Sequence, residues 1–102
     1  MNSASGSTIY NCFMIRSFKH KGLEQFFKTG SKAGISPSHA ARLRLQLAKL
    51  DGARGPDDMA MPGWRAHPLT TGHWPVWVNG NWRMAFAFEG VDAVLVNYLD
   101  YH

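Results

Sequence analysis

The chain has 102 residues, and its balance of 45% hydrophobic to 18% charged residues predicts one folded domain and excludes an intrinsically disordered chain. No apolar run approaches the ~20 residues of a membrane span, and Cys12, the single cysteine, excludes an internal disulfide framework.

The formal net charge is +4. The excess lies before Pro56, where only Glu24 and Asp51 oppose the basic residues Arg16, Lys19, Lys21, Lys28, Lys32, Arg42, Arg44, Lys49 and Arg54. This distribution suits a nucleic-acid partner, and ordinary solubility charge would account for it equally well.

Residues 1–13 are rich in serine and asparagine and have neither a basic start nor a long apolar stretch, so they do not form a signal peptide. We therefore predict a loose N-terminal extension over 1–13, a single domain over 14–102 and a cytoplasmic protein. Met14 is a candidate for the functional start, because regular sequence patterning begins there.

The first half predicts a short strand over Met14–Phe18 and two helices. Lys21–Thr29 carries apolar residues on one face, and Gly30 suits the position after its end. Ser36 and Pro37 are typical of a helix start, so a second helix is expected over Ser36–Asp51. Its apolar stripe is Ala40, Leu43, Leu47 and Leu50, and His39 is expected at its surface.

The second half predicts one helical turn near Asp57–Ala60 and then four strands joined by tight turns. The expected strands are Trp64–Leu69, Trp74–Val78, Trp82–Glu89 and Val91–Tyr98, the last with Val94 and Val96 on one face and Ala93 and Leu95 on the other. The element order β-α-α-β-β-β-β predicts an α+β fold in which two N-terminal helices pack on one face of a mainly antiparallel sheet.

The segment from Trp82 to Glu89 has the clearest alternation in the chain. Trp82, Met84, Phe86 and Phe88 form a core face, whereas Arg83 lies on the other face with small or polar residues. The glycines of Asn79-Gly80 and Glu89-Gly90 can close turns at the two ends. An arginine on the uncovered face of a rigid strand suits an anion site, and a solvated surface charge remains the alternative.

Few side chains point to chemistry. None of the five histidines has a zinc-ligand spacing, and neither a glycine-rich phosphate loop nor a nucleophile elbow is present. His67 and Arg83, with the C-terminal Asp100, Tyr101 and His102, remain as a set that a sheet meander could bring together. Imidazole near neutrality and a guanidinium are suited to metal-free phosphodiester cleavage. A strand-end histidine and a frayed terminus are the alternatives.

From Met14 onward the sequence resembles the HigB "plasmid maintenance killer" toxins of the RelE/ParE superfamily. The matching motifs, in chain order, are MIRSFKHKGL (14–23), HPL (67–69), NWR (81–83) and YLDYH (98–102).

This resemblance implies a RelE-like α+β fold and a metal-independent, cofactor-free mRNA endoribonuclease that acts in the ribosomal A site through 2′-OH attack. It also implies a HigA-like helix-turn-helix antitoxin, through which alone operator DNA would be bound. His67, Arg83, Asp100, Tyr101 and His102 match the active site of the family.

RNA contacts are expected from Arg42, Arg44 and Lys49 on the basic helix, a face that an antitoxin could cover instead. Thr70 stands where family members often carry lysine, which removes a cation from the expected site, and Arg65 is a candidate replacement. Two other functions stay open: a gyrase inhibitor like the ParE branch, and an inactive toxin that acts as an antitoxin co-repressor.

Overall fold

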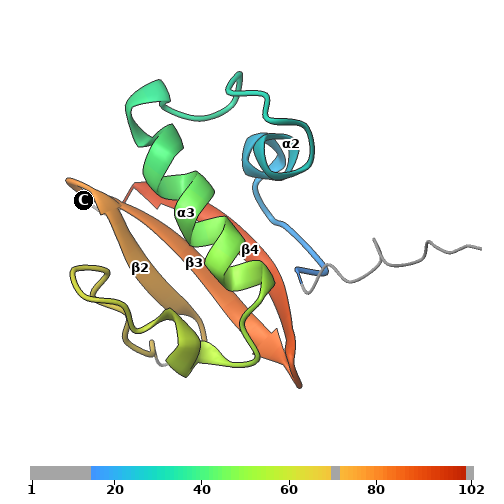
Figure 1. Ribbon diagram of the computed structural model, residues 1–102, viewed down its shortest axis with the longest axis vertical. Helices are drawn as coiled ribbons and strands as arrows, with labels where there is room; N and C mark the ends of the chain where they lie inside the picture. Colours follow the sequence, from blue (N-terminus) through green and yellow to red (C-terminus); the bar gives the residue numbers. More distant parts are fainter. Residues whose placement is uncertain (1–14, 70–71, 101–102) are drawn as a thin grey trace, which may run out of the picture.

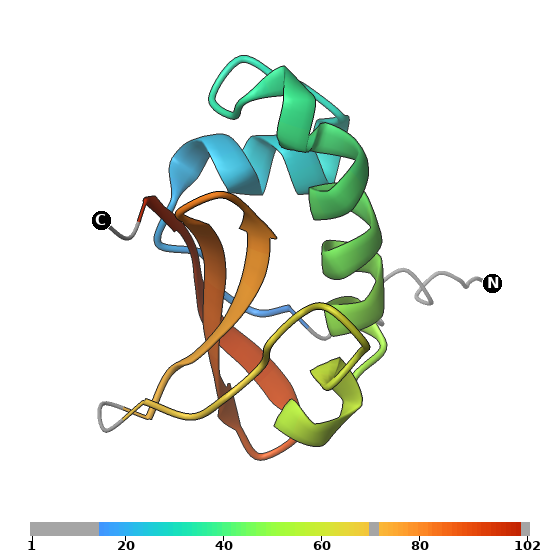
Figure 2. The ribbon, with the colours of Figure 1, turned by 90° about the vertical axis from the view of Figure 1, so that its left-hand side faces the viewer.

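The computed structural model describes residues 15–69 and 72–100, and these form an α+β structure with one sheet. Strands β2 (Trp74–Asn79), β3 (Trp82–Glu89) and β4 (Asp92–Asp100) are antiparallel neighbours in that order, with β3 in the centre. Helices α2 (Lys21–Thr29) and α3 (Ala40–Asp51) lie on the same side of the sheet (Figures 1 and 2). The predicted fold class is therefore confirmed. Within the described ranges, no helix has the length and apolar character that crossing a membrane requires.

The two helices begin and end close to where the sequence predicted. Helix α2 has the expected bounds, and Gly30 follows it with a φ of 82°, in the left-handed region that favours glycine. Helix α3 ends at Gly52 as expected, but its first turn is a 3₁₀ helix, η2 (Pro37–His39), and Ser36 makes no side-chain capping bond. A second 3₁₀ helix, η3 (Pro56–Met59), supplies the turn predicted near residue 57.

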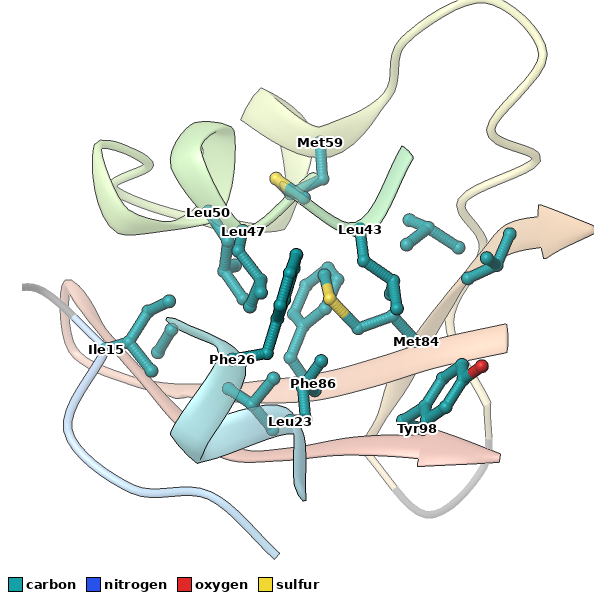
Figure 3. Packing of buried hydrophobic residues seen from close by; sticks show 14 of the residues in the cluster. Ile15, Leu23, Phe26, Leu43, Leu47, Leu50, Met59, Met84, Phe86 and Tyr98 are labelled. Atoms are coloured by element: carbon teal, nitrogen blue, oxygen red, sulfur yellow. The ribbon is translucent and has the colours of Figure 1, made fainter. Parts of the chain in front are cut away.

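The core lies between the helices and the sheet, as Figure 3 shows for its central residues. Leu43, Leu47 and Leu50 of α3 meet Met84 and Phe86 of β3, and all five are almost completely buried. The apolar stripe of α3 and the core face of β3 are therefore confirmed. Gln46 of α3 is also fully buried, although its polar side chain breaks the expected stripe.

The N-terminal segment contacts the outer edge of β4 without forming the predicted strand. Two isolated parallel bridges join Ile15 to Ala93 and Phe18 to Val96. Between them, the hydroxyl of Ser17 accepts a hydrogen bond of 2.8 Å from the amide of Leu95, which has a φ of 56°. This unusual backbone prevents a regular ladder.

The same irregularity changes the faces of β4. The pairing of β3 with β4 shifts between Ala85 and Ala87, so the simple alternation predicted along β4 was wrong. Ala93 and Val94 are both buried, whereas Leu95 is exposed. A β-bulge of this kind redirects the end of β4, which leads toward the C-terminus.

The strand predicted over residues 64–69 is also absent. This segment is an irregular arm that follows β2. The amide of Trp77 in β2 donates to the Trp64 carbonyl at 2.7 Å, and the Leu69 amide donates at 2.8 Å to the carbonyl of His73, the residue before β2. Between these contacts Arg65 has a φ of 56°. A left-handed residue cannot continue a ladder, which explains why the alternating sequence does not form a strand.

Two glycines let α2 approach the loop that precedes η2. A Cβ atom on Gly22 would lie 2.7 Å from the Cα of Gly34, and a Cβ on Gly34 would lie 2.5 Å from the Cα of Gly22. Both neighbours are backbone atoms, which no side-chain rotation can move. The pair therefore fixes how closely the start of α2 packs on this loop.

We expect Gly22→Ala to lower the free energy of unfolding by about 1–3 kcal/mol, because the clash exceeds the gain in helix propensity that alanine brings. Gly52→Ala is the matched control: it follows a helix in an ordinary α conformation and its Cβ would meet only the Lys49 carbonyl oxygen, at 3.9 Å. Urea unfolding of both variants measures the difference. Equal stability of the two variants would show that the glycine contact is not required.

Candidate functional site

Arg83 is mounted on the central strand, on the face opposite the core. Its half-buried side chain folds back over the β2–β3 turn, where Nη1 donates to the carbonyl oxygens of Gly80 and Trp82, each at 3.1 Å. A guanidinium carries five N–H donors, and both of these bonds come from one nitrogen. The turn therefore restricts the rotation of the cation and holds it in a fixed place on the sheet.

Trp77 lies directly opposite Arg83 on β2 and is held at three points. Its amide donates to the carbonyl of Trp64, its carbonyl accepts from Nε2 of Gln46 at 2.8 Å, and its indole Nε1 donates to the carbonyl of Gly80 at 3.0 Å. The Gly80 carbonyl thus receives both the indole and the Arg83 guanidinium. One turn residue fixes the two side chains relative to each other.

Two more arginines lie over the Trp77 ring. The guanidinium carbon of Arg42, from α3, is 5.1 Å from the ring centroid, and that of Arg65, from the irregular arm, is 4.9 Å away. Both distances are within the range of a cation–π interaction. Trp77 therefore contacts two arginines that are distant in the sequence and shares the Gly80 carbonyl with a third, Arg83. Sequence reasoning had not assigned Trp77 any role.

The pairing of the strands continues this group of residues from Trp77 across the sheet. Trp77 pairs with Arg83, and Arg83 pairs with Leu99, so that Arg65, Trp77, Arg83 and Leu99 form a row that crosses the strands. Asp100 lies next to the row, opposite Trp82. Because neighbouring residues of a strand face opposite sides, Asp100 and Arg83 lie on opposite faces at this end of the sheet. Figure 1 shows β4 ending beside the start of β3, next to the β2–β3 turn.

His67 lies on the irregular arm, two residues after Arg65, and is exposed. Its Nδ1 is 2.9 Å from the carbonyl oxygen of Arg65. A carbonyl oxygen only accepts, so Nδ1 carries the proton of the neutral ring and Nε2 has the free lone pair. The arm therefore presents the nitrogen that a general base needs. It also ties the imidazole to the arginine that lies over Trp77.

An aromatic cluster supports the end of β4 on the opposite, helix-covered face. Tyr98 stacks on Trp82 with ring centroids 4.5 Å apart, and its hydroxyl lies 2.7 Å from Nδ1 of His39. The same hydroxyl accepts from the amide of Ser36 at 3.3 Å. His39 is 6% exposed, so its prediction as a surface residue was wrong: the 3₁₀ turn rotates it inward to Tyr98.

The basic residues predicted on α3 divide between two surfaces. Arg42 lies over Trp77, whereas Arg44 lies over the ring of Phe26 in α2, with its guanidinium carbon 5.4 Å from the centroid. Two residues on a helix are about 200° apart, which explains the division. Lys49 is exposed and, seven residues after Arg42, lies on the Arg42 side. Thr70, Tyr101, His102 and residues 1–14 lie outside the described residues.

In residues 15–69 and 72–100, no three histidine, cysteine, aspartate or glutamate side chains lie close enough together to hold a metal ion. The candidate site instead contains the guanidiniums of Arg42, Arg65 and Arg83, the imidazole of His67 with a free Nε2, and the adjacent strand β4. Such a set can bind a polyanion and exchange protons with it.

Comparison with known proteins identifies the family of this chain. A sequence model of the RelE-like toxin HigB of type II toxin-antitoxin systems matches residues 16–102. The chain belongs to the HigB-like toxin family. It is also 37% identical over 92 residues to the endoribonuclease HigB of Proteus vulgaris, an alignment that covers 87% of this chain and the whole of that relative.

Within this HigB-like chain, the residues that sequence reasoning missed are Trp77, Gln46 and Tyr98. Trp77 had a detectable signal: it is a large aromatic residue on the outward face of a predicted strand, between two core valines. Gln46 and Tyr98 gave no such signal, because their roles depend on which polar atoms the folded chain brings near them.

The side chain of His20 caps α2, because its Nδ1 accepts from the amide of Leu23 at 2.9 Å. Only the neutral ring can accept there, and burial lowers the pKa of His20 below its usual value. A lowered pKa means that the unfolded chain binds this proton more readily than the folded protein does. The cap therefore contributes its full stabilisation above about pH 6.5, the unperturbed pKa of histidine. This stabilisation is lost as the pH falls through the lower pKa that His20 has in the folded protein.

We expect the stability of the protein to fall as pH drops from about 7 to about 5, and we expect His20→Asn to reduce that fall. Asparagine is a good N-cap that does not titrate. Urea unfolding at a series of pH values measures both curves. If the variant and the parent show the same pH dependence, His20 does not act as the pH-sensitive cap.

Proposed function

We propose that this HigB-like toxin is a ribosome-dependent endoribonuclease that cleaves mRNA, with Arg83 at the scissile phosphate. The observation that carries the proposal is how Arg83 is held. Its guanidinium is restrained by the β2–β3 turn and lies in a row with Trp77, beside the strand that leads to the expected catalytic tail. The name of the Proteus vulgaris relative, an endoribonuclease, supports the same activity.

The proposed reaction needs no metal ion. Nε2 of His67 takes the proton of a ribose 2′-OH, and the 2′-oxygen attacks the neighbouring phosphorus. The bond from phosphorus to the 5′-oxygen breaks, which leaves a 2′,3′-cyclic phosphate on one product and a 5′-hydroxyl on the other. Arg83 stabilises the charge that builds on the phosphate oxygens, as a planar fork of donors can do.

The C-terminal residues complete the proposed site. His102 gives a proton to the leaving 5′-oxygen, and Tyr101 stacks on an unpaired base. Asp100, which lies on the face opposite Arg83, does not contact the scissile phosphate and instead orients a neighbouring histidine or binds a base edge. The aromatic cluster around Tyr98 supports this assignment indirectly, since it anchors the strand from which the tail emerges to both helices.

The family implies an antitoxin partner, and the further partners are part of the proposal. A type II toxin has an antitoxin partner. We propose that this antitoxin is a HigA-like helix-turn-helix protein and that operator DNA is bound only through it. The proposed substrate is mRNA in the A site of the 70S ribosome, which would place the protein in the cytoplasm. Arg42, Arg65 and Lys49 are proposed to contact RNA on the Trp77 side, and Arg44 on a separate surface.

Replacing Arg83 with alanine should lower the rate of mRNA cleavage on translating ribosomes roughly 10²–10³-fold, the usual cost of removing a donor that stabilises transition-state charge. Arg54→Ala, which removes the same charge from an exposed position after α3, is the control and should leave the rate near that of the parent. Primer extension on a defined mRNA measures the rates. Similar rates for the parent and the Arg83 variant would exclude this residue from the mechanism.

The proposed chemistry also predicts its products. A transcript with a single 2′-deoxyribose at the cleavage position should resist cleavage there, because the nucleophile is missing. Mass spectrometry of the normal products should show a 2′,3′-cyclic phosphate or its 3′-phosphate hydrolysis product. Cleavage of the 2′-deoxy position, or a product with a 5′-phosphate, would require a different nucleophile.

A further inference from the structure

The two arginines over Trp77 are held in place without a carboxylate. The ion pairs found among the described residues involve Arg16 and Lys28, and none involves Arg42 or Arg65. The guanidinium carbons lie 5.1 and 4.9 Å from one ring centroid, which limits their separation to about 10 Å. An aromatic ring can orient guanidiniums while leaving their charge uncompensated, so this edge of the sheet holds a preformed pair of cations.

The position of Arg65 indicates that this arrangement is maintained at a cost. Its φ of 56° is unfavourable for a residue with a side chain, by about 1–2 kcal/mol. The arm is held in this conformation by the buried side chain of Trp64, the preceding residue, and by the hydrogen bond that the Trp64 carbonyl accepts from the Trp77 amide. Strained residues held by their surroundings concentrate at binding and catalytic sites, so this backbone suggests a ligand for Arg65.

We propose that Arg42 and Arg65, oriented by Trp77, bind a backbone phosphate of single-stranded RNA that flanks the scissile phosphate at Arg83. The RNA would then cross the sheet along the row of Leu99, Arg83, Trp77 and Arg65, perpendicular to the strands. This inference rests on the proposed function for the identity of the nucleic acid. It adds a second phosphate subsite and the direction of the RNA path.

Phosphate fits this subsite better than a base does. A bidentate guanidinium matches phosphate oxygens, and two cations near one ring favour an anion between or beside them. The Trp77 ring already contacts both guanidiniums, which leaves less of its surface for a stacked base. We therefore assign Trp77 a positioning role, in which it acts through the arginines and does not itself bind the substrate.

The test is the salt dependence of binding between the full chain and a short, fluorescent 2′-O-methyl oligoribonucleotide, which cannot be cleaved. For single strands, each neutralised phosphate contributes about 0.7 to the slope of log affinity against log salt concentration. Because the two arginines share one phosphate, Arg42→Gln and Arg65→Asn should each reduce that slope by up to one such contact. Asparagine is chosen at position 65 because it tolerates a positive φ.

Arg54→Gln is the matched control, because it removes the same charge from an exposed position after α3 that is not proposed to contact RNA. It should keep the parent slope. Trp77→Leu should lose the contribution of both arginines, whereas Trp77→Phe, which keeps a ring beneath the guanidiniums, should restore most of it.

Equal losses from Arg54→Gln and Arg42→Gln would show an effect of net charge and overturn the subsite, as would parent binding too weak to measure. The cleavage assay separates this inference from the proposed function. Cleavage that depends on Arg83, together with an oligonucleotide slope unaffected by Arg42 and Arg65, would leave the enzyme assignment intact and remove only the flanking subsite. Binding that depends on the arginines without any cleavage would do the reverse.

Discussion

The structure around the candidate site depends on how the edge strand β2 is fixed at Trp77. An edge strand has one row of unpaired backbone groups, and here both backbone groups of Trp77 are used: the amide bonds to the irregular arm and the carbonyl bonds to Gln46 of α3. Gln46 is fully buried, and its Oε1 has no hydrogen-bond partner among the described residues. An unsatisfied buried oxygen costs about 1–3 kcal/mol, so the link between α3 and β2 is made at the expense of stability.

This link joins three parts of the chain that are far apart in the sequence. Gln46 and Arg42 are one helical turn apart on α3, so the bond from Gln46 to β2 also places Arg42 near the indole. The arm brings Arg65 and His67 to the same edge, and the β2–β3 turn brings Arg83. The chemical groups come from a loop, a helix and a strand, and the Trp77 ring contacts the arginines of the helix and the loop. A rigid sheet with side chains supplied from its edges is well suited to positioning a flexible RNA strand.

Elements governed by local periodicity could be predicted from the sequence. The bounds of α2, the apolar stripe of α3 and the core face of β3 follow from spacing and from residue preferences at helix ends. The errors arose where a single residue has an unusual backbone. Leu95 and Arg65 both have φ near 56°, and each interrupts a segment whose alternation favours a strand. Neither residue type favours that conformation, so tertiary contacts impose it and the sequence gives no signal.

The candidate site shows the same division between local and tertiary information. Arg83 could be predicted because its strand alternates clearly, and the resemblance to HigB toxins added His67 and the C-terminal residues. The association of Arg42 and Arg65 with Trp77 could not be predicted, because it depends on how α3 and the arm lie against β2. His39 was wrongly expected at the surface, because the change from an α turn to a 3₁₀ turn is not evident in the sequence.

The most direct measurement of this arrangement is a structure of the toxin on a ribosome that carries a non-cleavable 2′-O-methyl mRNA codon in the A site. The account predicts one phosphate within hydrogen-bond distance of the Arg83 guanidinium, a neighbouring phosphate at Arg42 or Arg65, and an RNA strand that runs across β3 and β2. An RNA strand that runs parallel to the strands, or that lies on the helix-covered face with Arg83 away from every phosphate, would contradict it.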